Sequence, residues 1–198
     1  MDERTWSPLD TTVILEKSED VLDLTGHHSS YDLPALTNIA DEITLEVWFK
    51  HAPVAPTATE EYIYDDYIYN STYGPNGIII RIKNGKLNFF STRNSGGTKM
   101  RYSYPDTTVF DNQWHHAAIT ADASGNWKYY VDGVLVHTQT GPVGGSFYNT
   151  NTDKLGGAGG SNTRFVFDGA IKHLAVWNIP RTASQILKSY REHRVTPN

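Results

Sequence analysis

The sequence predicts an all-β protein, a two-sheet antiparallel jelly-roll sandwich with one short helix near its C-terminal end. Short β-rich segments recur along the chain, with turn signals about every 8 to 12 residues. Asn84-Gly85 and Asp132-Gly133, dipeptides that favour tight hairpins, lie between such segments. The 198 residues include 12 Tyr, 5 Trp and 16 Gly, a mixture typical of sheets with many turns. We therefore expect one domain over 1–198, with a lead-in at 1–12.

The clearest single strand is Ile43–Lys50, in which apolar and other residues alternate. Two further strands, one on each side of the turn at 122–126, are expected to form an antiparallel pair. The remaining expected strands lie at 78–83, 86–92, 101–104, 164–167 and 170–177. The terminal helix is expected over 182–193, because Thr182 and Gln185 have the spacing of a capping box.

Composition narrows the possible partners and sites. The formal net charge is -5 and the charges are dispersed, so neither nucleic acid nor an anionic membrane is an expected partner. The chain has no cysteine, which excludes disulfides, thiolate metal sites and a cysteine nucleophile. No apolar run approaches the roughly 20 residues of a membrane span, so membrane insertion is not expected. Met1–Arg4 lacks the layout of a signal peptide, so an extracellular role would need an export signal supplied elsewhere.

Four segments together are similar to one family. They are VLDLTGHHSSYDLP at 21–34, ITLEVWFK at 43–50, DNQWHHAAITADASGNWKYYVDGVLV at 111–136 and KLGGAGGSNTRFVFDGAIKHLAVWNIPRTASQI at 154–186. In order and spacing they resemble the laminin G-like, concanavalin A-like lectin/glucanase jelly rolls, and among these the LamG-like subgroup. The resemblance implies two curved sheets with a concave face that binds sugars or other ligands in relatives.

Most of the family-like positions are expected to be structural. Trp114, Ile119, Tyr129 and Val131 are interpreted as core residues and cross-strand pairs. Three glycines are interpreted as suppliers of turn geometry, namely Gly125, Gly133 and Gly169. This part of the chain is therefore expected to be scaffold.

Catalytic residues are not expected, although two arrangements suggest them at first sight. Glu42, Thr44 and Glu46 share one strand face, and similar hydrolases carry two glutamates at this separation with an aspartate between them. Here the middle residue is threonine. His115 and His116 are adjacent in a strand, so their side chains point to opposite faces and cannot bind one metal together. We expect a protein that is not an enzyme.

Calcium is a possible cofactor, because many members of the resembled superfamily hold this ion near the last strand in a Gly-x-Ile-Asp pattern. This chain has Lys172 in place of the aspartate, and its ammonium group is interpreted as a substitute for the cation. A different calcium site would have to draw on loop residues: Asp65, Asp66, Asp106, Asp111, Asn149, Asn151 and Asp153. No residue is assigned as a metal ligand.

The segment 60–77 is the best candidate for function, because it holds five tyrosines beside two adjacent aspartates. Exposed tyrosine rings next to hydrogen-bond acceptors suit a sugar. The expected ligand-binding residues are Tyr62, Tyr64, Asp65, Asp66, Tyr67, Tyr69, Arg93, Asn94 and Trp127. The alternative interpretation is that these tyrosines only brace the sandwich.

The favoured function is a non-catalytic, lectin-like module that binds a glycan or another cell-surface ligand. It would belong to a larger multidomain protein that is extracellular, on a cell surface or in a virion. The first alternative is a structural or protein-interaction domain of an adhesin or phage tail, without a sugar site. A distant alternative is a glycoside hydrolase or polysaccharide lyase.

Overall fold

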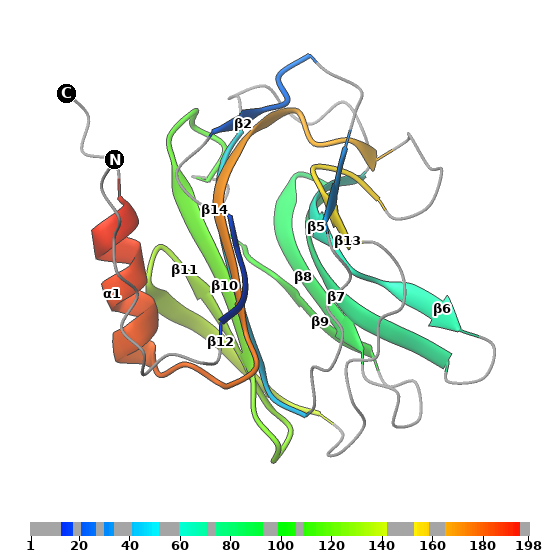
Figure 1. Cartoon of the computed structure of the whole chain (residues 1–198), viewed down its shortest axis with the longest axis vertical. Helices are drawn as coiled ribbons and strands as arrows, with labels where there is room; N and C mark the ends of the chain where they lie inside the picture. Colours follow the sequence, from blue (N-terminus) through cyan, green and yellow to red (C-terminus); the bar gives the residue numbers. More distant parts are fainter. Residues whose placement is uncertain are drawn as a thin grey trace.

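The fold is a sandwich of two antiparallel sheets with one helix, as the sequence predicted (Figure 1). It is seen in a computed structural model. The structure describes residues 13–17, 21–26, 30–33, 41–51, 60–70, 74–92, 99–105, 109–141, 153–158 and 165–194. The two antiparallel sheets and the single short helix within these ranges confirm the predicted all-β, jelly-roll class.

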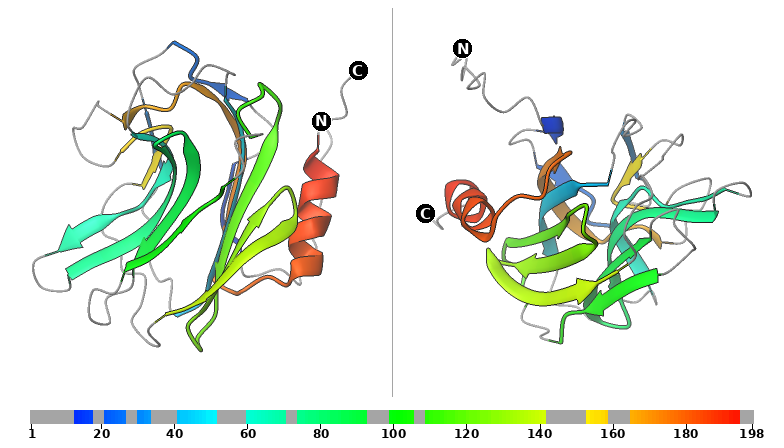
Figure 2. Two further views of the ribbon diagram at one scale, coloured as in Figure 1. Left: turned by 180° about the vertical axis from the view of Figure 1, so that it is seen from behind. Right: turned by 90° about the horizontal axis from the view of Figure 1, so that it is seen from below.

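Sheet A is the sheet that the helix covers. Its strand order is β1 (Val13–Lys17), β14 (Gly169–Trp177), β4 (Ile43–His51), β10 (His115–Ala121), β11 (Asn126–Val131) and β12 (Val134–Thr140), with β2 (Leu22–Asp23) paired to β14. The helix α1 (Ala183–His193) lies on the side of sheet A that faces away from the other sheet, and both views in Figure 2 agree on this.

Sheet B is curved, and its hollow side faces away from sheet A (Figure 1). Its order is β3 (Tyr31–Leu33), β13 (Asp153–Leu155), β5 (Glu60–Asp65), β7 (Gly74–Lys83), β8 (Lys86–Thr92) and β9 (Lys99–Ser103), with β6 (Ile68–Asn70) paired to β7. Each sheet therefore has an inner face toward the core and an outer face.

Strand alternation builds the core between the sheets. The four apolar residues predicted to share a face of β4 are fully buried there: Ile43, Leu45, Val47 and Phe49. They meet inward residues of sheet B, including Ile80 and Phe89. Because apolar burial is the main favourable term in folding, this interior layer fixes the register of both sheets.

Both predicted hairpin turns are confirmed. Asn84 and Gly85 have φ of 51° and 70°, and Asp132 and Gly133 have φ of 49° and 74°. A tight two-residue hairpin turn needs positive φ at both central residues, which glycine, asparagine and aspartate tolerate. The Asn84-Gly85 turn sets which residues of β8 stand opposite β7, and therefore which side chains share the outer face of sheet B.

The structure corrects three details of the expected fold. Residues 165–167 form no regular strand, and Val166 makes only an isolated parallel bridge to Tyr62. Gly169 lies in β14 without positive φ, so it does not supply turn geometry; a Cβ there would collide with the Lys50 carbonyl oxygen. Trp114 is half-buried and lies against the ammonium groups of Lys50 and Lys172, outside the core.

The terminal helix begins where the capping box predicted. The Gln185 amide donates to the Thr182 hydroxyl, and the Thr182 amide donates to the Gln185 side chain at 2.8 Å. Ile186 is fully buried against Ala118 and Tyr130 on the outer face of sheet A. The helix therefore closes one outer face of the sandwich.

Candidate functional site

The tyrosine-rich segment does not present all its rings to solvent. Tyr64 is fully buried in the core, and its hydroxyl donates to Asp153 at 3.0 Å. A bulge between Tyr62 and Tyr64 breaks the alternation of β5, so that both Ile63 and Tyr64 join the core between the sheets. Trp127 is also fully buried in that core. The expectation that Tyr64 and Trp127 offer ring faces to a ligand is wrong.

The two adjacent aspartates are buried as well. Asp65 accepts a hydrogen bond from the Tyr67 amide at 2.8 Å, and Asp66 accepts one from the Ile78 amide. Burial raises the pKa of Asp66 well above its ordinary value, and the charges of Asp153 and Asp65 raise it further. With only 4% of each residue exposed, Asp65 and Asp66 stabilise the turn after β5 and are not accessible acceptors for a sugar, which corrects that expectation.

Tyr62 and Tyr67 lie on the outer, hollow face of sheet B and meet residues that the sequence did not single out. We call this group the aromatic–arginine face: Tyr62, Tyr67, Arg81, Phe90, Arg101 and Phe165. Phe165 stacks on Tyr62 with ring centroids 5.1 Å apart. Tyr67 meets the ring of Phe90 edge-on at 5.5 Å. The rings form one connected cluster, which also includes Ile79 and Ala158.

Arginines lie against the same rings. The Arg81 guanidinium is 5.4 Å from the Tyr62 ring and 5.5 Å from the Phe90 ring, and the Arg101 guanidinium is 5.4 Å from the Phe90 ring. Strand register explains this, because Tyr62 pairs with Arg81 across β5 and β7, and Phe90 pairs with Arg101 across β8 and β9. Cations over ring faces are favourable, and more so where water is partly excluded.

A hydrogen-bonded network fixes Arg81 in place. Its Nη1 donates to Glu60 and contacts the Tyr62 hydroxyl, both at 2.9 Å, and its Nε donates to Asn88 at 2.9 Å. Burial alone would raise the pKa of Glu60, but the hydrogen bond from Lys83 and the charge of Arg81 outweigh it and hold the pKa below its ordinary value. Burial raises the pKa of Tyr62 to about 12. Glu60 is therefore ionised and Tyr62 neutral at pH 7.

The face has a buried layer and an accessible layer. Tyr62, Arg81 and Phe90 are between 5% and 8% exposed. Tyr67 and Phe165 are half-buried, and Arg101 is exposed. A ligand would therefore meet Arg101 and the outer edges of two aromatic rings first, supported from below by side chains that are already held in position.

Two residues of this face, Arg81 and Phe90, could have been found from the sequence. In the strands around Asn84-Gly85, alternation separates inward Ile78, Ile80 and Ile82 from outward Arg81, and the turn then places Phe90 on the outward side. The position of Phe165 on this face could not be found in this way, because the residue lies in an irregular segment far along the chain. Among the other expected ligand-binding residues, Arg93, Asn94 and the side chain of Tyr69 lie outside the described residues.

The residues that suggested catalysis are held beneath the helix. Glu46 is fully buried on the outer face of sheet A, where it contacts His116 Nε2 at 3.1 Å and accepts a hydrogen bond from Arg181. Thr44 accepts a hydrogen bond from the Arg181 amide at 2.8 Å and donates to the Ile179 carbonyl at 2.7 Å. This strand face is closed to a substrate.

The two adjacent histidines point to opposite faces, as predicted. His116 packs against Trp48 and Tyr190 on the helix side. His115 packs against Phe49 and contacts Asp132 at 2.8 Å and Asp111 at 3.1 Å. Burial alone would lower the pKa of His115, but the hydrogen bond and charge of Asp132, together with those of Asp111, raise it.

Lys172 stands where the calcium pattern of the superfamily has its aspartate. The Lys172 ammonium donates to the His193 carbonyl at the end of α1, at 3.3 Å, and lies over the rings of Trp48 and Trp114. Within the ranges that the structure describes, no three carboxylate or histidine side chains are arranged to hold a metal ion. Of the loop candidates, Asp106, Asn149 and Asn151 lie outside those ranges. Calcium binding stays a prediction.

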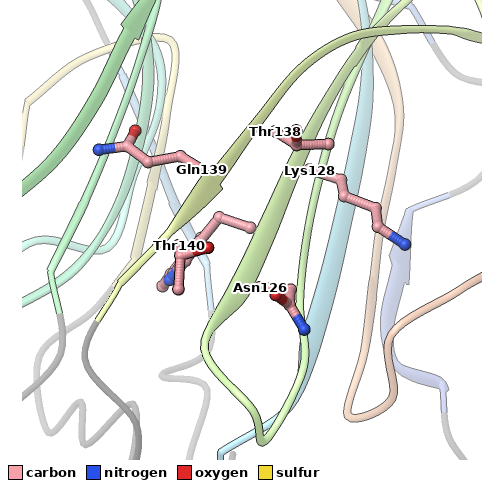
Figure 3. A pocket seen from close by; sticks show the side chains of 6 residues that line it. Asn126, Lys128, Thr138, Gln139 and Thr140 are labelled. Atoms are coloured by element: carbon pink, nitrogen blue, oxygen red, sulfur yellow. The ribbon is translucent and has the colours of Figure 1, made fainter.

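A pocket of about 320 Å³ lies elsewhere, at the open end of the β11–β12 pair (Figure 3). It is lined by Asn126, Trp127, Lys128, Thr138, Gln139 and Thr140. The close-up shows that Gln139 points away from Lys128 and Asn126, toward the other sheet. Its polar groups do not converge on one ligand position, so the aromatic–arginine face is the better candidate.

Comparisons with known proteins agree with this architecture. The family model described as "Concanavalin A-like lectin/glucanases superfamily" matches residues 25–187. Human Pappalysin-1 is 27% identical over 164 residues, which are 77% of this chain, and the mouse protein is 28% identical over 158 residues, 74% of this chain. The chain spans about a tenth of the length of these relatives, 10% and 9% respectively.

Solved structures share the fold at low sequence identity. The receptor binding domain of botulinum neurotoxin D matches with a TM-score of 0.60 at 15% identity, covering 90% of this chain and 47% of that chain. The binding domain of botulinum neurotoxin DC in complex with SialylT matches with a TM-score of 0.56 at 17% identity, covering 78% and 36%. Such likeness extends to the fold alone. In the part of the chain that the structure describes, no helix is long and apolar enough to cross a membrane.

Proposed function

Because the chain belongs to the concanavalin A-like lectin/glucanase superfamily, we propose that it is a non-catalytic module that binds a glycan on the aromatic–arginine face. The observation that carries this proposal is the layering of that face. Buried Tyr62, Arg81 and Phe90 hold the partly exposed rings of Tyr67 and Phe165 beside an exposed Arg101. Flat apolar rings next to hydrogen-bond donors are what a pyranose ring needs for stacking and orientation.

A binding role is favoured over hydrolysis. Glu46 is the carboxylate that resembled a catalytic residue, and it is fully buried and paired with His116 and Arg181. Retaining hydrolysis needs two carboxylates on either side of the scissile bond. Beside the aromatic–arginine face, the carboxylate of Glu60 is instead paired with Arg81 and Lys83.

The wider setting of the module is also part of the proposal. Relatives that match this chain are about ten times longer than the matched part, which supports a module within a larger protein. We propose that it works in the extracellular space, at a cell surface or in a virion. The ligand is then a glycan carried by another molecule or cell.

A glycan array tests the proposal. Wild-type protein is expected to bind at least one glycan class, and Tyr67→Ala and Phe165→Ala are each expected to weaken that binding by at least about tenfold, because truncating a central aromatic contact costs about 1–2 kcal/mol. Tyr31→Ala is the matched control, since Tyr31 is 57% exposed on β3, outside the aromatic–arginine face.

Circular dichroism of each variant shows whether the fold is kept. Binding that is equally strong in folded Tyr67→Ala and Phe165→Ala proteins would place the site elsewhere. If no glycan binds at all, the alternative of a protein-interaction domain takes its place.

A further inference from the structure

The three neighbouring strands β7, β8 and β9 of sheet B carry only basic charged residues, although the chain as a whole is acidic. Strands β7, β8 and β9 contain no Asp or Glu, while their basic residues are Arg81, Lys83, Lys86, Lys99 and Arg101. The formal net charge of the chain is -5. These three adjacent strands therefore carry charges of one sign, opposite to the net charge of the chain.

Like charges are placed beside one another on these strands. Lys83 and Lys86 stand directly opposite across the hairpin, a pairing that destabilises a sheet when nothing compensates it. The Arg81 and Arg101 guanidinium groups lie against the same ring, that of Phe90, at 5.5 and 5.4 Å from its centroid. The arrangement concentrates positive charge around one ring.

In the part of the chain that the structure describes, one carboxylate pairs with the basic side chains of these strands. Glu60, from the neighbouring strand β5, accepts hydrogen bonds from both Arg81 and Lys83. In the described part of the chain, neither Lys86 nor Arg101 forms an ion pair with a carboxylate. Among the described residues, the positive charge on these strands therefore exceeds the negative charge paired with it, and a bound anion would relieve the repulsion.

We infer that the aromatic–arginine face selects an anionic glycan, a saccharide that carries carboxylate or sulfate groups. This inference rests on the proposed function, because it adds a ligand class to the same site. Arg101 is the selecting residue. Its guanidinium is exposed and positioned over Phe90, and a planar guanidinium matches a carboxylate or sulfate with two parallel hydrogen bonds. Tyr67 and Phe165 would hold the sugar ring beside it.

The test is titration calorimetry with three defined probes: polygalacturonate oligosaccharides, a heparin-derived oligosaccharide and a neutral dextran oligosaccharide. The two anionic arms separate a carboxylate ligand from a sulfate ligand. At least one anionic probe is expected to bind more tightly than dextran, with affinity that falls between 50 and 300 mM NaCl, because salt screens exposed charges.

Arg101→Gln is expected to weaken the binding of that probe about tenfold, which is the usual loss for one charge-assisted hydrogen-bonded contact. Arg101→Lys, which keeps the charge without the planar fork, should lose less. Arg191→Gln is the matched control, because Arg191 is an exposed arginine on α1, on the outer side of the opposite sheet, and its loss removes the same charge.

Three results would overturn the inference: no anionic probe binds, dextran binds as tightly as both anionic probes, or Arg191→Gln weakens binding as much as Arg101→Gln. Failure of this inference can be told apart from failure of the proposed function. If dextran binds without salt dependence and Tyr67→Ala abolishes that binding, the proposed site is right and only its charge selectivity is wrong. If an anionic probe depends on Arg101 but not on Tyr67 or Phe165, the aromatic site itself is wrong.

Discussion

Replacing Glu46 with alanine is expected to lower the free energy of unfolding by about 3 kcal/mol, because it leaves two partners of a buried ionic network without their carboxylate. Glu46 is fully buried, and it connects His116 of β10 to Arg181, which precedes α1. Arg181 also donates to Ser189 of the helix at 2.7 Å. Loss of the carboxylate should therefore loosen the helix as well as the strand.

Urea unfolding followed by tryptophan fluorescence measures this change. Glu42→Ala is the control, since Glu42 is a half-buried glutamate four residues earlier in the same segment. A loss below about 1 kcal/mol for Glu46→Ala would contradict the account, because the network would then contribute little to stability. A comparable loss in Glu42→Ala would show that the segment, and not the pairing, is sensitive.

Acid is expected to destabilise the protein through His173. This residue is 5% exposed and stacks on His193 of α1, with ring centroids 3.5 Å apart. Burial, together with the charges of His193, His116, Lys172 and Arg181, lowers the pKa of His173 to about 3. The ordinary pKa of histidine is about 6.5. Between this pH and about 3, His173 therefore takes up a proton in the unfolded chain but not in the folded protein.

The sign of the effect follows from that difference. Well above pH 6.5, His173 is neutral in both the folded and the unfolded state and has no influence on stability. Between pH 6.5 and about 3 the unfolded state binds more protons, so stability falls as the pH falls, by about 2 kcal/mol between pH 6.5 and 5. The raised pKa values of His115 and Asp66 act in the opposite direction, because those groups bind protons more tightly in the folded state.

His173→Asn isolates the contribution of His173. The residue has a φ of 48°, and asparagine tolerates this left-handed conformation without a titrating group. The free energy of unfolding of each protein would be measured from pH 7.5 to 5. Over this range the wild type is expected to lose about 2 kcal/mol more than the variant. Parallel pH profiles for the two proteins would contradict this role.

The scaffold was largely predictable from the sequence, because strand alternation and turn chemistry are local. The alternation of Ile43 to Phe49 and the two dipeptide turns placed β4 and two hairpins correctly. The bulge in β5 was not predictable, since it arises from pairing with β7. It alone moves Tyr64 from the expected site into the core.

The site was predictable only in part, for the same reason. Tyr62 and Tyr67 were among the expected ligand-binding residues and lie on the outer face of sheet B. Their neighbours Arg101 and Phe165 come from segments distant in the chain, so only the folded arrangement places them together. The helix is a further example, because local capping predicted its start but not that it would cover Glu46.

The most direct test of the central claim is to map where a bound glycan lies. Amide chemical shifts of ¹⁵N-labelled protein would be recorded during titration with the tightest glycan found on the array. We expect the largest changes in β8, β9 and the backbone around Tyr67, which surround the aromatic–arginine face. Changes centred on the β11–β12 pair or on α1, with β8 and β9 unaffected, would contradict the claim.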